Sequence, residues 1–547
     1  MVLILVSWCI MAAFFGVWGT AVSKWLSVSP PSGGVFFLGM MTQTLVLTIV
    51  VFFAPLNGMI FLANALLTSV LAYTVRDELQ KTGRELWHSF QNFSHFDKVL
   101  LGLATLAALW KSAQLPFLID NDTYYLQTIK WLHEHGLVKG LANLNVAFGQ
   151  TSPWQILQAG FDLPFTGWPL NDLNGLAFVI FVFILLGLTD KVSSRYILLF
   201  STLLLQFVTA PSPDLPVILI LVLAFFAYTD RAPGWWAVLV VYAIFLKVTA
   251  LPFALLLVVA LLRRTLPLRF AVGIAAPCAV VWIAKNIWLS GYPLFPSTGV
   301  AFDFDWTVPE PVAASLGDMI RNHEFMGEAG FRSFGWLDRL DLWWRMDGLD
   351  RLFNIGMLAL FPLALVLKGK NSSFRLLWTV CLLHFGFIIV VSPQYRFFLP
   401  EFVFLGTLVA AELTDRLRLP ERLQQTVLVG ALVLPFVLPL ALGNRPLTGN
   451  GKMALNDSYA LRLILWPSPI TRLPDLTFET ERVGNLRYNT PPKDAYFHTT
   501  GDGPLPCTNR RILERNARKY GVVPQLRTAN PGDGFRSLPA DEWDKTN

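Results

Sequence analysis

Charged side chains are scarce in this chain. Asp, Glu, Lys and Arg together make up 15% of its 547 residues, whereas a soluble globular protein carries roughly 25%. Hydrophobic residues make up 54% of the sequence. A surface with so little charge is poorly hydrated, so the composition excludes an ordinary soluble enzyme and indicates a protein that faces lipid.

Cysteine is scarce too, and no Cys-x-x-Cys motif occurs, which argues against a zinc site and against a disulfide framework. A basic segment before the first apolar run is also absent, so we expect residues 1–18 to be a retained helix rather than a signal peptide. The matched halves of an inverted-repeat transporter are not found. The four cysteines are Cys9, Cys278, Cys381 and Cys507.

Apolar runs of helical length are abundant, and a lipid-facing segment must close its backbone hydrogen bonds in a helix. We therefore predict an all-α membrane protein with about 14 transmembrane helices, two long external loops and a small external C-terminal region. The predicted helices are 3–22, 34–54, 58–75, 98–114, 173–189, 195–210, 215–229, 233–249, 251–263, 268–288, 352–367, 375–392, 398–414 and 424–442.

These helices divide the chain into three parts. Residues 1–97 hold three N-terminal helices and a cytoplasmic loop. Residues 98–442 form a transmembrane core with external loops at 115–172 and 289–351, and 443–547 form the external C-terminal region.

Lys and Arg are concentrated in alternate short loops, which all fall on one side if there are fourteen crossings. The positive-inside rule makes that side cytoplasmic. The net charge of +6 therefore reflects orientation, and we expect no nucleic acid partner. Reading 233–249 and 251–263 as one kinked helix would invert the rest, but the cluster of Arg263, Arg264 and Arg269 argues against it. We expect a multi-pass protein of the bacterial inner membrane whose site faces the periplasm or exterior.

The first external loop begins with two carboxylates, Asp120 and Asp122, directly after a predicted helix. Asp122 could simply cap the helical run that follows, since Asp is a favoured cap. Asp120, near the membrane surface, could accept a proton from a hydroxyl group. The pair could also hold a divalent cation, Mg or Mn, which is the one cofactor that the sequence suggests.

The rest of this loop is rich in amides and aromatic rings, which carbohydrate sites use for hydroxyl groups and flat sugar faces. Tyr124, Gln150 and Trp154 are the candidates for substrate binding. The same composition also marks ordinary loops.

Further polar residues map to the same outer surface. Lys247 stands in an apolar run, where a charge is a functional candidate unless it snorkels to the interface. Cations in this position suit a phosphate or diphosphate group, for which Arg is the best planar partner. The full set of candidates is Asp214, Lys247, Lys285, Asn286 and Arg396.

In these motifs the chain resembles the GT-C superfamily of membrane glycosyltransferases over about 100–440. Asp120-Asn121-Asp122 stands where those enzymes carry acidic residues, in the first large external loop. Lys285-Asn286, followed by Gly291-Tyr292-Pro293 and Pro296, is similar to a stretch of protein mannosyltransferases and aminoarabinose transferases, although Lys285 replaces the commoner Arg. Three helices precede the acidic loop, where the superfamily usually has one.

The resemblance implies a GT-C-like fold and transfer of a sugar from a polyprenyl-(di)phosphate carrier to a glycan or lipid acceptor, in cell-surface polysaccharide or glycolipid synthesis. It implies an acidic catalytic role for Asp120 and Asp122, and phosphate recognition by Lys247 and Arg396.

Two other functions remain open. One is a polysaccharide polymerase or a flippase for lipid-linked sugars. The other is a secondary transporter, in which Lys247 and Asp214 would bind substrate near the midplane of the membrane. The depth of the polar residues in the membrane separates a transporter from the enzyme. A transporter needs its polar groups near the midplane, whereas these residues cluster at one surface.

Overall fold

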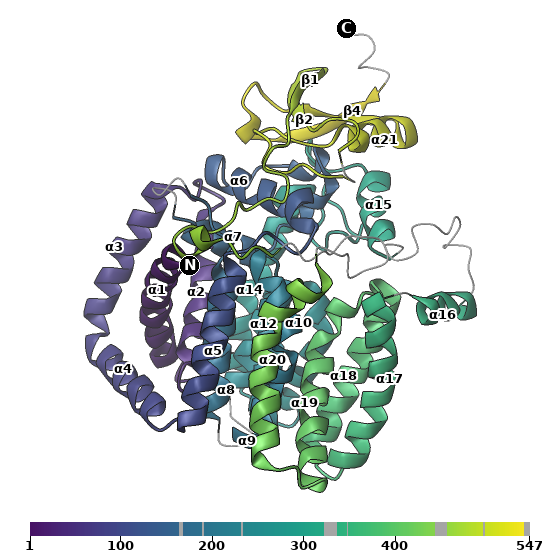
Figure 1. Ribbon diagram of the computed structural model, residues 1–547. Coiled ribbons are helices and arrows are strands. Elements are labelled where there is room, and N and C mark those ends of the chain that lie inside the picture. The colour runs from purple at the N-terminus through teal and green to yellow at the C-terminus, as the bar shows by residue number, and fades with distance from the viewer. Residues whose placement is uncertain are drawn as a thin grey trace.

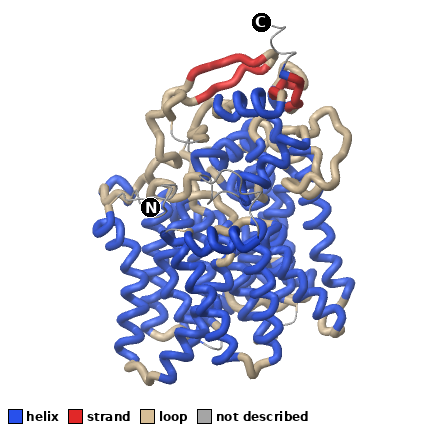
Figure 2. The backbone as a smooth tube through the Cα atoms, turned by 90° about the vertical axis from the view of Figure 1, so that its right-hand side faces the viewer, coloured by secondary structure: helices blue, strands red, loops and turns tan. Residues whose placement is uncertain are grey.

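The computed structural model describes residues 1–163, 168–188, 191–230, 234–321, 336–346, 348–443, 457–495 and 498–540. This part of the chain is mostly helical. A bundle of long helices forms the body, and a smaller cap carrying the strands lies at one end of it (Figure 1). The view from the side shows the same two layers, with both strand pairs beyond the ends of the helices (Figure 2).

The bundle combines long and interrupted helices. Its N-terminal half contains α1 (Val2–Leu26), α2 (Gly34–Val50), α3 (Gly58–Thr74), α4 (Arg76–Gln91), α5 (His95–Ser112), α8 (Leu173–Gly187), α9 (Lys191–Arg195), α10 (Ser201–Leu204) and α11 (Asp214–Thr229). Its C-terminal half contains α12 (Trp235–Leu246), the 3-10 helix η6 (Val248–Phe253), α13 (Ala254–Leu262), α14 (Leu268–Ser290), α17 (Gly348–Lys368), α18 (Ser372–Val391), α19 (Leu399–Arg416) and α20 (Glu421–Leu442).

Several of these helices are compatible with an integral membrane protein. Within the described residues, α1, α14, α17, α18 and α20 are long and apolar enough to cross a membrane, and the pair α3 and α4, bent by 88°, would make a sixth span. Their outward faces expose large apolar side chains, such as Val280 and Leu440, that water would not favour. The number of crossings, fourteen, stays a prediction.

Shorter apolar helices fill the middle of the bundle. In α11, every residue from Asp214 to Ala227 is buried. Such a helix is surrounded by protein rather than lipid, so it need not have the length of a lipid-facing span.

The segment predicted as one helix at 195–210 is broken into three short pieces. Two 3-10 helices, Tyr196–Phe200 and Leu205–Thr209, flank α10. The first packs against α19 and α20, and the second packs against α5 and α8. Irregular backbone is tolerated at this depth because neighbouring helices cover it.

The predicted cytoplasmic loop at 76–97 contains a helix, α4, that the charge-rich sequence did not suggest. Its residues are all exposed or half-buried. It is amphipathic rather than apolar, so a search for apolar runs passes over it. The capping box of Ser94 and Asp97 then starts α5.

The cap is built from the two external loops and the C-terminal region. The loops supply the π-helix η1 (Asn121–Tyr125), α6 (Leu126–Glu134), α7 (Pro153–Phe161) and α15 (Glu310–Arg321) to the cap. The second loop also contains α16 (Trp336–Arg345), which lies beside the end of α17 (Figure 1). The C-terminal region supplies α21 (Arg510–Tyr520) and two antiparallel hairpins, which pair β1 (Glu479–Val483) with β2 (Leu486–Thr490) and β3 (Val522–Leu526) with β4 (Phe535–Pro539). The sequence from Cys507 to Tyr520 is basic and could form one helix, and α21 lies within it.

The C-terminal region is bound tightly to the first external loop. The backbone amides of Thr500 and Gly501 each donate to the Asp122 carbonyl at 2.8 Å. Gln127 donates its side-chain amide to the carbonyl of Gly501. Lys111, at the end of α5, forms a buried ion pair with Asp457 at 2.6 Å. The first loop and the chain terminus therefore form one packed unit.

Candidate active site

A cavity of about 280 Å³ lies where the C-terminal ends of α12, α14 and α18 meet the cap. Its lining is both polar and apolar, with rings and aliphatic side chains such as Trp282, Phe295 and Leu316 beside charged groups. Seven of the ten candidate residues line it: Asp120, Tyr124, Gln150, Lys247, Lys285, Asn286 and Arg396.

Asp120 and Arg396 meet across this cavity. Asp120 precedes η1, and Arg396 lies between α18 and α19. The Arg396 Nη1 atom donates to Asp120 Oδ2 at 2.7 Å, and its Nε atom donates to the Gln394 side-chain oxygen at 2.8 Å. The Arg396 guanidinium is thus held at two points, and it orients the carboxylate of Asp120.

Asp214 joins this pair to Lys247. It is the first residue of α11, and its side chain is 2% exposed. One of its oxygens receives a hydrogen bond from the Lys247 ammonium, and the other lies 3.4 Å from Arg396 Nη1. The cations also share a ring, because Lys247 Nζ lies 3.7 Å from the centroid of Phe397 and Arg396 Cζ lies 5.0 Å from it. Burial opposes the charge of Arg396, but Asp120 and Asp214 raise its pKa well above the ordinary value.

Lys285 and Asn286 line the cavity from the outer end of α14. The Lys285 ammonium donates to the Asn286 side-chain oxygen at 2.7 Å, and the Asn286 amide donates to the Pro293 carbonyl at 3.2 Å. Both side chains are buried. Within the described chain no carboxylate lies within ion-pairing distance of Lys285.

The first external loop adds hydroxyl and amide groups. Burial, and the nearby charge of Asp120, raise the pKa of Tyr124 well above its ordinary value, so this side chain stays a phenol that can donate a hydrogen bond. Gln155, which the sequence did not single out, caps α7 with its side-chain oxygen. Its buried amide nitrogen has no hydrogen-bond partner in the described protein. That nitrogen is a donor available to a ligand hydroxyl group.

Asp122 and Trp154 do not line the cavity. Asp122 does not cap α6, whose N-cap residue is Tyr125. Its carboxylate accepts hydrogen bonds from the Thr471 hydroxyl and from Arg472. Burial raises its pKa, and the contacts with Thr471 and Arg472 oppose the rise. Trp154 is fully buried, with its indole nitrogen 2.7 Å from the Asn174 side-chain oxygen.

The two carboxylates at the start of the loop therefore serve different partners. Asp120 faces Arg396 in the cavity, and Asp122 faces the C-terminal region. No cluster of three His, Cys, Asp or Glu suited to a metal is found in the described residues. A metal role for this pair stays a prediction.

Two polar residues of the cavity come from the C-terminal region. His498 and Arg515 line it, together with Ile512 of α21. They lie more than 370 positions from Asp120 along the chain. A charged residue in a basic amphipathic helix carries no local sign of such a role, so the sequence did not indicate them.

A buried pair of polar side chains stabilises the backbone at one side of the cavity. His384 of α18 and Glu401 of α19 share a hydrogen bond, and their side chains are at most 1% exposed. The other ring nitrogen of His384 lies 3.0 Å from the carbonyl of Thr249, which lines the cavity in η6. The pair therefore fixes the backbone that follows Lys247.

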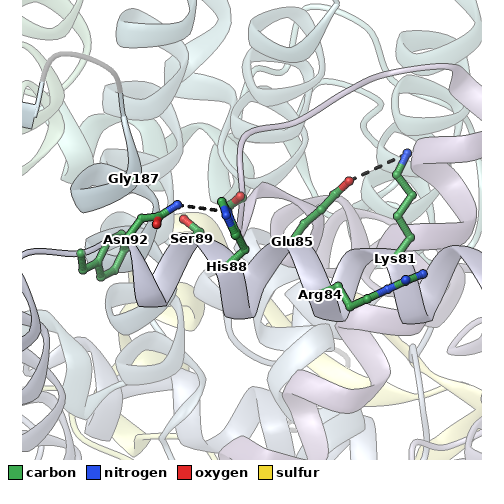
Figure 3. Close-up of a pocket in the computed structure, with 9 residues that line it drawn as sticks. Lys81, Arg84, Glu85, His88, Ser89, Asn92 and Gly187 are labelled. Carbon is green, nitrogen blue, oxygen red and sulfur yellow. Dashed lines mark hydrogen bonds and ion pairs between the residues drawn. The ribbon is translucent and has the colours of Figure 1, made fainter.

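A second pocket, of about 530 Å³, lies along α4 (Figure 3). Lys81 and Glu85 approach to 3.8 Å there, and the amide of Asn92 lies 3.0 Å from a ring nitrogen of His88. All four side chains are exposed. This is a solvated groove with internally paired groups, and it lacks the buried charges of the cavity.

Comparison with known proteins gives one family. A family model described as "Domain of unknown function (DUF8201)" matches residues 1–403. The match includes Asp120, Lys247 and Arg396 and stops before the C-terminal region. No curated protein and no solved structure matches the chain.

Proposed function

The chain belongs to the DUF8201 family, and from the cavity of this member we propose a membrane glycosyltransferase. It moves a sugar from a polyprenyl-(di)phosphate carrier to a glycan or lipid acceptor at the outer face of the membrane. The observation that carries the proposal is that Asp120, Lys247, Lys285 and Arg396 line one cavity together with apolar side chains.

Each part of the cavity suits one part of such a donor. The cations suit a phosphate group, which a guanidinium can bind through two parallel hydrogen bonds. The amides and phenol of the first loop suit sugar hydroxyl groups. The apolar side chains suit the isoprenoid units next to the phosphate.

The proposed reaction uses Asp120 as a general base. The acceptor hydroxyl group gives its proton to the carboxylate as its oxygen forms a bond to C1 of the sugar. The bond from C1 to the phosphate oxygen breaks, and that oxygen leaves with the electron pair. Lys247 and Arg396 stabilise the charge that develops on the leaving phosphate, and in-line attack inverts C1.

We also propose the full topology of fourteen crossings, with the cavity on the periplasmic or external side of a bacterial inner membrane. The ends of α12, α14 and α18 that line the cavity are the ends that the distribution of Lys and Arg places outside. A lipid-linked donor would then reach the cavity from the outer leaflet.

Replacement of Asp120 tests the proposed chemistry. Asp120→Asn removes the proton acceptor but keeps the shape and one hydrogen-bond acceptor for Arg396. We expect transfer of label from radiolabelled polyprenyl-phosphate sugars to fall at least about 100-fold, which is the contribution of a positioned general base. The assay uses the purified full chain in lipid nanodiscs with membrane extract as the source of acceptor.

Asp475→Asn is the matched control, because Asp475 is an exposed carboxylate of the C-terminal region. It should transfer label at the wild-type rate. Full activity of Asp120→Asn, or no transfer from any polyprenyl-phosphate sugar by the wild type, would contradict the proposal.

A further inference from the structure

The outer wall of the cavity is formed by α21, a helix beyond the matched family region. It packs on β3 and on α15. Its side chain Ile512 joins Leu316, Met319 and Ile320 of α15 in the lining, and Arg515 follows one turn later. Figure 1 shows α21 and α15 at the same end of the helical bundle. A guanidinium is thus held over the cavity by an element of the C-terminal region.

Two further cations of the site are already paired with carboxylates. Arg396 contacts Asp120 and Asp214, and Lys247 contacts Asp214. Each of these cations therefore shares its charge between a carboxylate and any ligand that enters.

Arg515 is in a different state. Its Nε atom is buried and has no hydrogen-bond partner in the described protein. No carboxylate of the described residues lies within ion-pairing distance of its guanidinium. A buried donor without an acceptor is costly, and the cost falls when an acceptor arrives.

His498 lines the same part of the cavity. Its pKa is lowered to about 4, mainly by burial and in smaller part by the positive charges of Arg515 and Arg511. His498 is therefore neutral at physiological pH and adds no charge of its own. An anion entering this part of the cavity would meet an unbalanced guanidinium.

We propose that Arg515 binds a phosphate oxyanion of the substrate, so that the C-terminal region completes the donor site. The proposal rests on the proposed function, because the lipid-linked donor supplies the phosphate. The planar guanidinium offers two parallel donors that match a phosphate. The apolar side chains beside it receive the adjoining isoprenoid.

Arg515→Ala tests this role with probes that need no knowledge of the sugar. Binding of C55 polyprenyl phosphate, uncharged polyprenol and inorganic phosphate to the purified full chain is measured by thermal shift and by equilibrium binding. We expect Arg515→Ala to weaken binding of polyprenyl phosphate roughly tenfold or more, the usual effect of losing a charged hydrogen bond. Binding of polyprenol should not change. Arg515→Lys should recover part of the loss, because it restores charge without the planar fork.

Arg518→Ala is the matched control, since Arg518 is an exposed cation on the same helix. It should bind polyprenyl phosphate as the wild type does. An unchanged melting temperature without ligand shows that a variant is folded, and if Arg515→Ala fails this check, Arg515→Lys and Arg515→Gln are compared instead.

The outcomes separate the two proposals. Equal binding of polyprenyl phosphate by wild type and Arg515→Ala overturns the role of Arg515 and leaves the proposed function standing. Arg515-dependent binding of inorganic phosphate without binding of the lipid supports Arg515 and contradicts the proposed donor. A wild type that binds neither phosphate overturns both.

Discussion

Asp162 ends α7 as a carboxylic acid that water scarcely reaches. Its side chain is buried, and one oxygen accepts a hydrogen bond from the Leu170 amide at 2.8 Å. Its pKa is raised to about 8, mainly by burial and in smaller part by the nearby charge of Asp172, while the hydrogen bond from Leu170 opposes the rise. The folded chain therefore holds a proton there that the unfolded chain, with an ordinary carboxyl group, would release.

Because of Asp162, the protein should become less stable as the pH rises. Its pKa is higher in the folded than in the unfolded chain, so its contribution to the free energy of unfolding is complete below about pH 4 and is lost as the pH rises toward 8. Asp162→Asn removes that loss. We expect the melting temperature of the variant, relative to wild type, to be higher at pH 8 than at pH 5, measured by differential scanning fluorimetry in detergent. Asp475→Asn should show no such trend, and a difference that shrinks toward pH 8 would refute the argument.

Asp120 and Asp122 show how far the site could be predicted from single residues of the sequence. Their position after a helix indicated an acidic start to the loop, and Asp120 does line the cavity with Arg396. Although the two residues are only two positions apart, their side chains point in different directions, because residues i and i+2 of a helix point to nearly opposite sides. Asp122 therefore reaches Thr471, a partner 349 positions away that no local pattern could identify.

At the scale of elements, the contact between α18 and α19 depends on a buried polar pair. Each ring nitrogen of His384 faces an acceptor, Glu401 on one side and the Thr249 carbonyl on the other. Removing one member leaves the other buried without its partner, which is far more costly than the loss of a surface pair.

Glu401→Ala should lower the free energy of unfolding by about 3 kcal/mol for that reason. Glu412→Ala is the control on the same helix, because Glu412 pairs with Lys368 and Arg416 near the surface and should cost at most about 1 kcal/mol. Both values come from reversible denaturation of the full chain in detergent. Equal costs for the two variants would show that the buried pair has no special role.

The elements themselves were largely predictable where lipid-type apolar runs define them. The boundaries of α14, α17 and α18 lie within a few residues of the predicted 268–288, 352–367 and 375–392. Apolar content did not predict the breaks within 195–210, where neighbouring helices cover an irregular backbone, or the amphipathic helix α4. In both cases the structure depends on contacts with neighbouring elements, and these contacts cannot be inferred from the apolar content of the sequence.

For the whole molecule, the orientation in the membrane can be tested by cysteine labelling. In a Cys9→Ser background, which removes the exposed native thiol, we expect Asp475→Cys to react with a membrane-impermeant maleimide in intact cells. Lys81→Cys, on α4, should react only after the membrane is opened, because the two residues lie at opposite ends of the bundle. Labelling of Lys81→Cys in intact cells would reverse the proposed orientation.

The composition alone indicated a membrane protein, and the described helices are compatible with a membrane protein. The part that the C-terminal region plays at the cavity was not predictable, since Ile512 and Arg515 reach it only through the folding of the whole cap. Contacts between distant segments have no signature in one sequence.

The packing of the chain terminus on the first external loop also sets an order for biogenesis. Gln127 and the Gly501 carbonyl that it binds lie 374 positions apart. At a synthesis rate of 5–20 residues per second, the loop waits roughly 20–75 s for this partner. Asp120 is made before that interval begins, Arg396 is made within it, and Arg515 follows after it. The lining of the cavity is complete only after the segment that contains Arg515 has been made, so an unfinished chain lacks part of it.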